Sequence, residues 1–122
     1  MNGELAFTMT ADHVRLHGFY SAAPGPAEKI VGGCDAAVLI HGLGGNFYST
    51  RVLNHFAKVL QSIGVSTVLI NTRGHDMINT STWGVGSRSV GAAFENVSDC
   101  IHDVSGWVDY LKNKGHQNVL LL

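Results

Sequence analysis

The order of apolar segments constrains the fold of this 122-residue chain more than any other feature of its sequence. Three short apolar runs, residues 36–40, 65–71 and 118–122, alternate with two segments in which apolar residues recur every three or four positions. Such runs are typical of strands buried on both faces of a parallel sheet, and the longer spacing predicts amphipathic helices. Because parallel strands need crossover connections, the alternation predicts a β-α-β-α-β unit of the α/β class.

Each expected helix has a glycine at its end and an apolar face along its length. The first helix should run from Arg51 to Gly64 and the second should end at Gly115, since glycine readily adopts the left-handed conformation that ends helices. The residues expected to face the sheet are Val52, Phe56, Val59, Leu60 and Ile63 in the first helix, and Val97, Ile101, Val104, Trp107, Val108 and Leu111 in the second.

The remaining segments predict a hairpin and two loops. Leu5–Thr10 and Val14–Ser21 are rich in Thr, Val, Phe and Tyr, which favours a β-hairpin around the "ADH" between them. Proline and glycine predict a loop at residues 22–33, and glycine and serine predict a long surface loop at Ser81–Gly91. The expected fold is therefore α/β, with an N-terminal β-hairpin followed by β-α-β-α-β.

Composition excludes several functions. A length of 122 residues with 45% hydrophobic residues fits one domain, and a formal net charge of −1 provides no basic patch for nucleic acid or anionic lipid. No apolar run approaches membrane-spanning length, and the first residues lack a signal-peptide pattern. Cys34 and Cys100 lack CxxC spacing, so we expect two small buried residues in a reducing compartment and a cytoplasmic location.

The most informative motif follows the first central strand, where "IHGLGGNFYST" spans residues 40–50. Glycines at a strand-to-helix turn supply unusual backbone angles or let a ligand approach the main chain, although a tight turn without a ligand is also common. Ligands of α/β proteins bind at the carboxyl ends of the strands, where "NTRGHD" (71–76) also lies. A dinucleotide loop would need glycine at Phe47, and a P-loop would need Lys-Ser/Thr after the last glycine.

Four segments in this order and spacing resemble the N-terminal half of an α/β-hydrolase, near its serine esterase, lipase and aminopeptidase-like members. They are "AAVLIHGLGGNFYS", "VLINTRGHD", "DCIHDVSGWVDYLKNKG" and "NVLLL", and the resemblance covers Leu5–Leu122. It implies a partial α/β-hydrolase parallel sheet, with residues 1–122 as the N-terminal part of a single domain truncated before the nucleophile elbow. The implied activity of the complete protein is serine hydrolysis of a carboxylic ester or amide.

The resemblance also implies roles for the glycine-rich turn. The backbone N–H of Leu43 would be one of two donors to the oxyanion, the second following the nucleophile in a G-x-S-x-G elbow. His41 would bond neighbouring loop backbone rather than act as a general base, and a helix starting after Asn46 would add a favourable dipole. The glycines that would keep side chains out of this space are Gly42, Gly44 and Gly45.

The turn "NTRGHD" (71–76) departs from the pattern R-G-H-G-x-S of the resembled family, because Asp76 stands in place of the second glycine. The resemblance implies that Arg73 and His75 brace loops around the active site, while Asp76 is open to a substrate-facing role. Asp99 and Asp103 lie one helical turn apart, and we expect a solvated polar face or pairing with an arginine, namely Arg73 or Arg88. The seven histidines and two cysteines show no metal-binding spacing, so we expect no metal.

The catalytic triad of the resembled family is expected outside these residues. The family needs serine, acid and histidine in that order, with the serine elbow directly after "NVLLL". Ser89 in "SRSVG" is a near match, but it follows a polar segment with only His102 and His116 after it, so we interpret it as a loop serine. We therefore expect the chain alone to be inactive. Its expected partners are a small-molecule ester or amide and the missing C-terminal half of the domain, with no cofactor.

Two other classes of function fit the same strand and helix order. A noncatalytic hydrolase-like module would bind a small ligand in the same cleft, and it would lack serine at the elbow. A flavodoxin-like or Rossmann-type protein would bind a nucleotide or flavin, which would protect it from thermal unfolding. The fold alone does not distinguish these functions.

Overall fold

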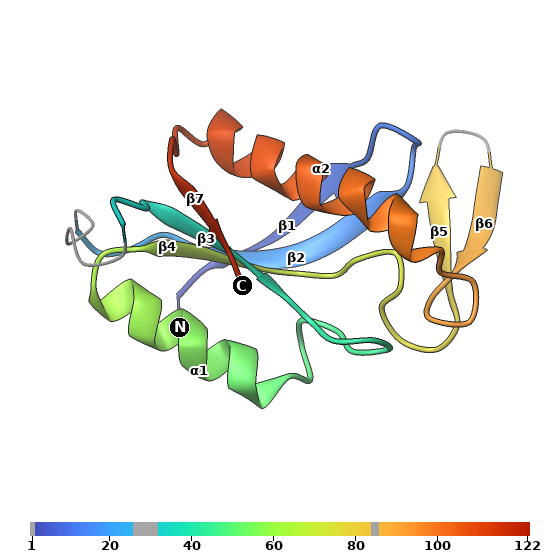
Figure 1. The fold of residues 1–122 in the computed structure, drawn as a ribbon, viewed down its shortest axis with the longest axis horizontal. Helices are drawn as coiled ribbons and strands as arrows, with labels where there is room; N and C mark the ends of the chain where they lie inside the picture. Colours follow the sequence, from blue (N-terminus) through green and yellow to red (C-terminus); the bar gives the residue numbers. More distant parts are fainter. Residues whose placement is uncertain (1, 26–31, 84–85) are drawn as a thin grey trace.

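The central element of the computed structural model is a five-stranded mixed sheet, in a structure that describes residues 2–25, 32–83 and 86–122. The strand order is β1-β2-β4-β3-β7 (Figure 1). β3 pairs in parallel with β4 and β7, whereas β2 pairs antiparallel with both β1 and β4. The strands are β1 (Glu4–Met9), β2 (Arg15–Ser21), β3 (Ala36–Ile40), β4 (Ser66–Ile70) and β7 (Val119–Leu121).

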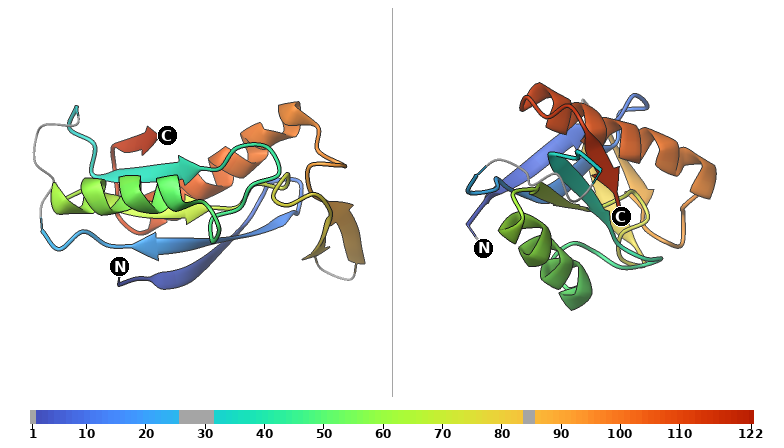
Figure 2. Two further views of the ribbon diagram at one scale, coloured as in Figure 1. Left: turned by 90° about the horizontal axis from the view of Figure 1, so that it is seen from below. Right: turned by 60° about the vertical axis from the view of Figure 1, so that its left-hand side comes forward.

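Two helices cover opposite faces of this sheet (Figure 2). α1 (Arg51–Ser62) connects β3 to β4, and α2 (Cys100–Asn113) precedes β7 after a short 3-10 helix, η1 (Val97–Asp99). Side chains of β3 alternate between the two apolar clusters, since Val38 packs on the α2 side and Leu39 on the α1 side. The α/β class, the N-terminal hairpin and the β-α-β-α-β order are therefore confirmed.

A second hairpin replaces the surface loop predicted at Ser81–Gly91. β5 (Asn79–Trp83) and β6 (Gly86–Val90) pair antiparallel, with residues 84–85 outside the described part. Ser81 is buried, and its hydroxyl accepts a hydrogen bond from the Arg15 N–H and donates one to the Arg15 carbonyl (3.1 and 3.2 Å). The loop prediction was wrong because this tertiary contact outweighs the loop preference of glycine and serine.

The apolar face predicted for α1 is only partly correct. Leu60 is buried, but Val52, Phe56 and Val59 are 62%, 49% and 48% exposed. The helix packs instead along a line that includes Ala57, which is fully buried. Alanine lets the helix approach the sheet closely. The buried stripe with Ala57 and the exposed stripe with Phe56 overlap around the helix, and periodicity alone cannot show which of the two is buried.

At the start of the second helix, the residues that are buried differ from those that were expected to be. Trp107 and Leu111 are buried as predicted, whereas Val97 and Ile101 are exposed. Asp103 was expected on a polar, solvated side or in an arginine pair, and it is fully buried. The solvated alternative was wrong because an arginine from the turn after β4 reaches this carboxylate.

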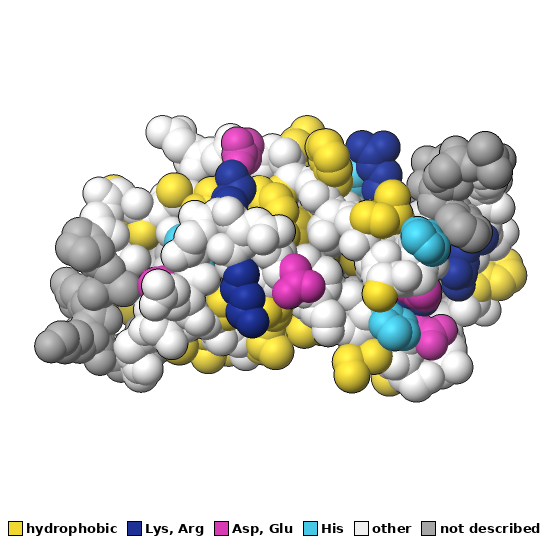
Figure 3. Space-filling view, turned by 90° about the horizontal axis from the view of Figure 1, so that it is seen from above, with side chains coloured by type: hydrophobic (Ala, Val, Ile, Leu, Met, Phe, Trp, Pro, Cys, Tyr) yellow, Lys and Arg dark blue, Asp and Glu magenta, His cyan; other side chains and the backbone are white. Residues whose placement is uncertain are grey.

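The remaining predictions concern the cysteines, the loop at residues 22–33, surface charge and membrane-spanning length. Cys34 and Cys100 are free and half-buried rather than buried, and the loop predicted at residues 22–33 lies partly outside the described residues, which omit 26–31. On the face of the molecule shown in Figure 3, lysine, arginine and acidic side chains are scattered, not gathered by sign. Among the described residues, no helix has both the length and the hydropathy needed to cross a membrane.

Candidate active site

The glycine-rich turn after β3 is fixed by backbone and histidine contacts. His41 is buried, and its Nδ1 donates to the Gly42 carbonyl (2.7 Å) while its Nε2 accepts from the Thr72 N–H (3.1 Å). The Gly45 N–H closes the turn on the Gly42 carbonyl (2.9 Å), and Gly44 has a positive φ of 66°. Both ring nitrogens of His41 are therefore engaged in holding the loop backbone.

The Leu43 N–H is one of the uncommitted donors of this turn, since the N–H groups of Gly42 and Gly44 likewise form no hydrogen bond among the described residues. Within the described part of the chain, no hydrogen bond of the Leu43 N–H is found, and the Leu43 side chain is 83% exposed. Leu43 also lines a cavity of about 230 Å³ at the carboxyl end of β3. The other residues lining this cavity are Ile40, His41, Gly42, Thr72, Gly74, Glu95, Cys100 and Val104.

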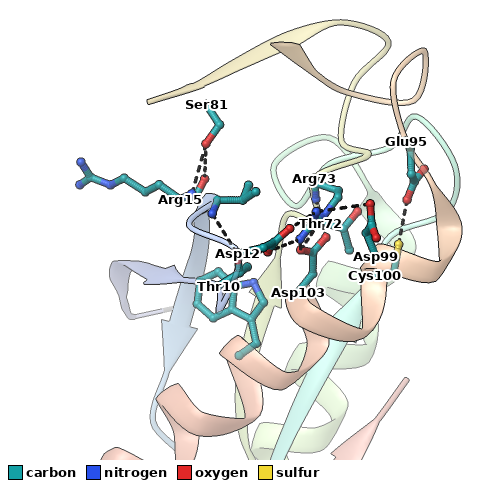
Figure 4. Close-up of polar contacts among 12 residues, drawn as sticks. Thr10, Asp12, Arg15, Thr72, Arg73, Ser81, Glu95, Asp99, Cys100 and Asp103 are labelled. Atoms are coloured by element: carbon teal, nitrogen blue, oxygen red, sulfur yellow. Dashed lines mark hydrogen bonds and ion pairs between the residues drawn. The ribbon is translucent and has the colours of Figure 1, made fainter. Parts of the chain in front are cut away.

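A carboxylate and a thiol form the α2 side of this cavity. The Cys100 thiol donates to Glu95 Oε1 (2.9 Å, Figure 4), and burial together with this carboxylate raises the pKa of Cys100 to about 12. The thiol is therefore protonated at neutral pH and is a poor nucleophile. A side chain at position 74 would collide with the Glu95 carboxylate, so Gly74 allows Glu95 to lie here.

A short turn separates the glycine-rich turn from the first helix. α1 starts at Arg51, as predicted, and residues 47–49 form a turn between Asn46 and the helix. The Asn46 side chain accepts from the Ser49 N–H (2.8 Å), and the Thr50 hydroxyl donates to the Asn46 carbonyl (2.8 Å). Such local bonds compete with helix formation, and the helix dipole acts only within about one turn of the helix end.

The turn after β4 contains a buried arginine bound by carboxylates from two other segments (Figure 4). Arg73 donates to Asp12 through Nη1 and Nη2 (2.6 and 2.8 Å), and to Asp103 through its N–H, Nε and Nη2 (2.8 to 3.0 Å). Asp99 lies 3.7 Å from Arg73 Nη1. Hydrogen bonds from Arg73 hold the pKa of Asp12 well below its ordinary value. Of the two alternatives given for Asp99 and Asp103, pairing with Arg73 is confirmed.

His75 and Asp76 complete the same turn. His75 Nδ1 lies 2.9 Å from Asp76 Oδ2, and the Asp76 N–H donates to the Gly45 carbonyl (3.0 Å). Asp76 has a φ of 56°, a left-handed conformation that glycine adopts more easily. The two turns at the carboxyl ends of β3 and β4 are therefore joined directly.

The other candidate residues lie apart from these turns. Ser89 is an exposed residue of β6, so the prediction of a loop serine was wrong about its local structure. His102 is half-buried on α2, while His116 follows the far end of that helix and bonds the Tyr20 hydroxyl (3.0 Å). Neither histidine is hydrogen-bonded to Ser89 among the described contacts.

Sequence reasoning did not identify several residues around the site. Asp12 and Glu95 contact it from segments outside the two motifs, whereas Thr72 belongs to the "NTRGHD" motif but was given no role. Asp12 precedes a turn residue with positive φ, His13, but that signal does not reveal a partner 61 positions away. Among the described residues, no three His, Cys, Asp or Glu side chains are grouped to hold a metal ion.

Comparison with known proteins identifies the fold. Neither a protein-family model nor a curated protein sequence matches the chain. Solved structures do match it. The esterase Pf2001 of Pyrococcus furiosus has 18% identity and a TM-score of 0.64, over 92% of this chain and 36% of its own. The α/β hydrolase GrgF of Penicillium sp. sh18 has 17% identity and a TM-score of 0.71, over 99% and 37%. An α/β serine hydrolase homologue from Coxiella burnetii has 19% identity and a TM-score of 0.67, over 99% and 51%.

These matches show that the chain has the α/β-hydrolase fold, as the resemblance of its motifs implied. The chain spans about a third to a half of the length of the structures that it matches. At such low sequence identity the likeness concerns the fold, and the chemistry must be argued from the residues themselves.

Proposed function

We propose that this chain is the N-terminal part of a serine hydrolase that cleaves a carboxylic ester or amide, and that its Leu43 N–H is one of two oxyanion donors. The observation that carries the proposal is the uncommitted Leu43 N–H, in a turn fixed by His41 and Gly45, beside the cavity at the carboxyl end of β3. A donor that is fixed before the reaction needs no reorganisation when charge develops, which makes it effective in catalysis.

The proposed chemistry assigns no bond-breaking side chain to this chain. A base would take the proton of a serine hydroxyl as its oxygen attacks the carbonyl carbon, and the π electrons of the C=O bond would move to the carbonyl oxygen as an anion. The Leu43 N–H would donate to that oxygen together with a second donor, and each donor would stabilise the transition state by about 3–4 kcal/mol. When the C=O bond re-forms, the bond to the alcohol or amine would break and this leaving group would take the proton, after which water would release the acyl group from the serine by the same steps. The nucleophile, the acid, the base and the second donor would belong to another segment, so the chain alone would be inactive.

The proposed partner is a further segment of the same domain. β7 is the edge of the sheet in the described residues, and Leu121 and Leu122 at this edge are about half exposed. Val52, Phe56 and Val59 on α1 and Val97 and Ile101 before and within α2 also remain exposed. A strand edge and apolar helix faces are normally covered, so further strands and helices that pack here would complete the domain.

The remaining assignments follow from the same proposal. Arg73 would support the active site through its carboxylate partners, and His75 would do so through Asp76. The substrate would be a small molecule with an ester or amide bond, and the enzyme would act in the cytoplasm without a cofactor or metal.

The experiment that tests the proposal replaces Leu43 in the completed enzyme. Leu43→Pro removes the N–H, so kcat should fall by about a hundredfold, whereas Leu43→Ala keeps the donor and should change kcat little. Circular dichroism and thermal unfolding establish that both variants fold. Equal kcat of the wild type and a folded Leu43→Pro variant would show that Leu43 is not the donor.

A further inference from the structure

Asp76 occupies a position where the backbone favours glycine but the side chain makes several contacts. Its φ of 56° is left-handed, a conformation that glycine adopts more easily than other residues. Asp is among the few other residues that tolerate this conformation, because its short polar side chain can bond locally. A non-glycine residue held in this conformation points to a role for its side chain.

The Asp76 carboxylate accepts hydrogen bonds from two residues of the loop after β3. Asn46 Nδ2 donates to Oδ1 (2.7 Å) and the Tyr48 hydroxyl donates to Oδ2 (2.6 Å). His75 Nδ1 approaches Oδ2 from within the same turn (2.9 Å). These bonds are short, as expected when the acceptor carries a negative charge.

The backbone of Asp76 connects the same segments. Its N–H donates to the Gly45 carbonyl (3.0 Å), and its own carbonyl accepts from the Ala92 N–H (2.8 Å). The loop beyond Gly45 is held further by Asn71, whose Oδ1 accepts from the Phe47 N–H (2.9 Å). Asp76 thus lies between the glycine-rich turn, the turn after β4 and the segment after β6.

We infer that Asp76 is a positioning residue for the oxyanion loop: through Asn46, Tyr48 and the Gly45 carbonyl it holds the segment that carries the Leu43 N–H. The inference rests on the proposed function for its catalytic consequence, but the loop attachment itself does not. Asp76 itself would not contact the substrate. The alternative, a substrate-facing Asp76, is an outcome of the test below.

Hydrogen exchange of the 122-residue chain tests the attachment without any enzyme activity. Asp76→Gly removes the carboxylate at a φ that glycine tolerates, so amides of residues 45–49 should exchange about tenfold faster, while those of β3 and β4 stay unchanged. Asp76→Asn keeps one acceptor oxygen and should lie between the wild type and Asp76→Gly. Asp109→Asn is the matched control, because Asp109 is exposed on α2 and its change removes the same charge.

The completed enzyme supplies the second readout. If the loop positions an oxyanion donor, Asp76→Gly should lower kcat by about tenfold and leave KM nearly unchanged, and Asp76→Asn should restore part of kcat. Unchanged exchange of residues 45–49 in Asp76→Gly, or a rise in KM with kcat unchanged, would overturn the inference. Faster exchange combined with no hydrolase activity in the completed wild type would leave the attachment standing and reject the proposed function.

Discussion

The turns that follow β3 and β4 lie side by side at the carboxyl ends of these two neighbouring strands, but different interactions hold them. The β3 turn is fixed by backbone geometry around Gly42–Gly45 and leaves the Leu43 N–H uncommitted. In the β4 turn, the backbone N–H and the side-chain donor atoms of Arg73 all bond carboxylates (Figure 4). An uncommitted main-chain donor is therefore suited to ligand binding, whereas a saturated ion-pair network is suited to support.

The largest effect is expected from breaking the β4 turn. Arg73→Ala leaves the carboxylate of Asp103, which is 0% exposed, without its cation. Removing one partner of a buried ion pair costs about 3–5 kcal/mol, so the free energy of unfolding in urea should fall by that amount. Arg88→Ala is the matched control, because Arg88 is exposed on β6 and its loss should change stability by less than about 0.5 kcal/mol. A loss below about 1 kcal/mol for Arg73→Ala would mean that the network does not support the fold.

Two glycines of the β3 turn allow a sharper comparison within one loop. A Cβ at Gly45 would lie 3.0 Å from the Gly42 carbonyl oxygen and 3.2 Å from His41 Cβ, so Gly45→Ala should destabilise the chain by about 1–3 kcal/mol. A Cβ at Gly42 would meet no described atom within 4 Å, so Gly42→Ala should change stability by less than about 0.5 kcal/mol. Thermal unfolding of the two variants checks this difference, and equal destabilisation would contradict the steric explanation.

The sequence predicted these two turns better than it predicted what holds them. Apolar runs and helix periodicity placed β3, β4, α1 and α2, because buried strands and amphipathic helices leave local patterns. Tertiary contacts do not leave such patterns. For Asp103 the sequence left a solvated face and a pair with Arg73 or Arg88 both open, since only the fold brings Arg73 to this carboxylate. Ser81 looked like a loop residue, since only the fold places it on the Arg15 backbone.

In the candidate site, too, the local turn could be predicted from the sequence and its tertiary contacts could not. The glycine-rich turn after β3 was recognisable, because its glycines are adjacent in the sequence. The role of Asp76 was left open, because its partners Asn46 and Tyr48 lie about 30 positions away. The exposed face of α1 was misassigned for another reason, namely that periodicity cannot tell a face packed on the sheet from one that a further segment would cover.

The smallest expected effect is on the pH dependence of stability, and it concerns the carboxylate of Asp76, which joins the two turns. Its bond from Tyr48 is the main reason why the pKa of Asp76 is lowered from 3.8 to about 2. A carboxyl group with a lowered pKa stabilises the folded state above its unfolded pKa, and this contribution disappears as the pH falls from about 4 to about 2. The difference in unfolding free energy between wild type and Asp76→Asn should therefore shrink over this range. A difference that stays constant over this pH range would contradict the charge-based account of the attachment.

The most direct measurement of the central claim is the sequence of the source locus beyond the codon for Leu122. If the chain is the first part of a serine hydrolase, the β7 strand should lead into Gly-x-Ser-x-Gly within a few residues, with an aspartate or glutamate and then a histidine further downstream. A stop codon directly after Leu122 in a verified gene would contradict the proposed missing segment. A continued reading frame without a serine at the elbow would contradict the proposed serine hydrolase and favour a noncatalytic binding module.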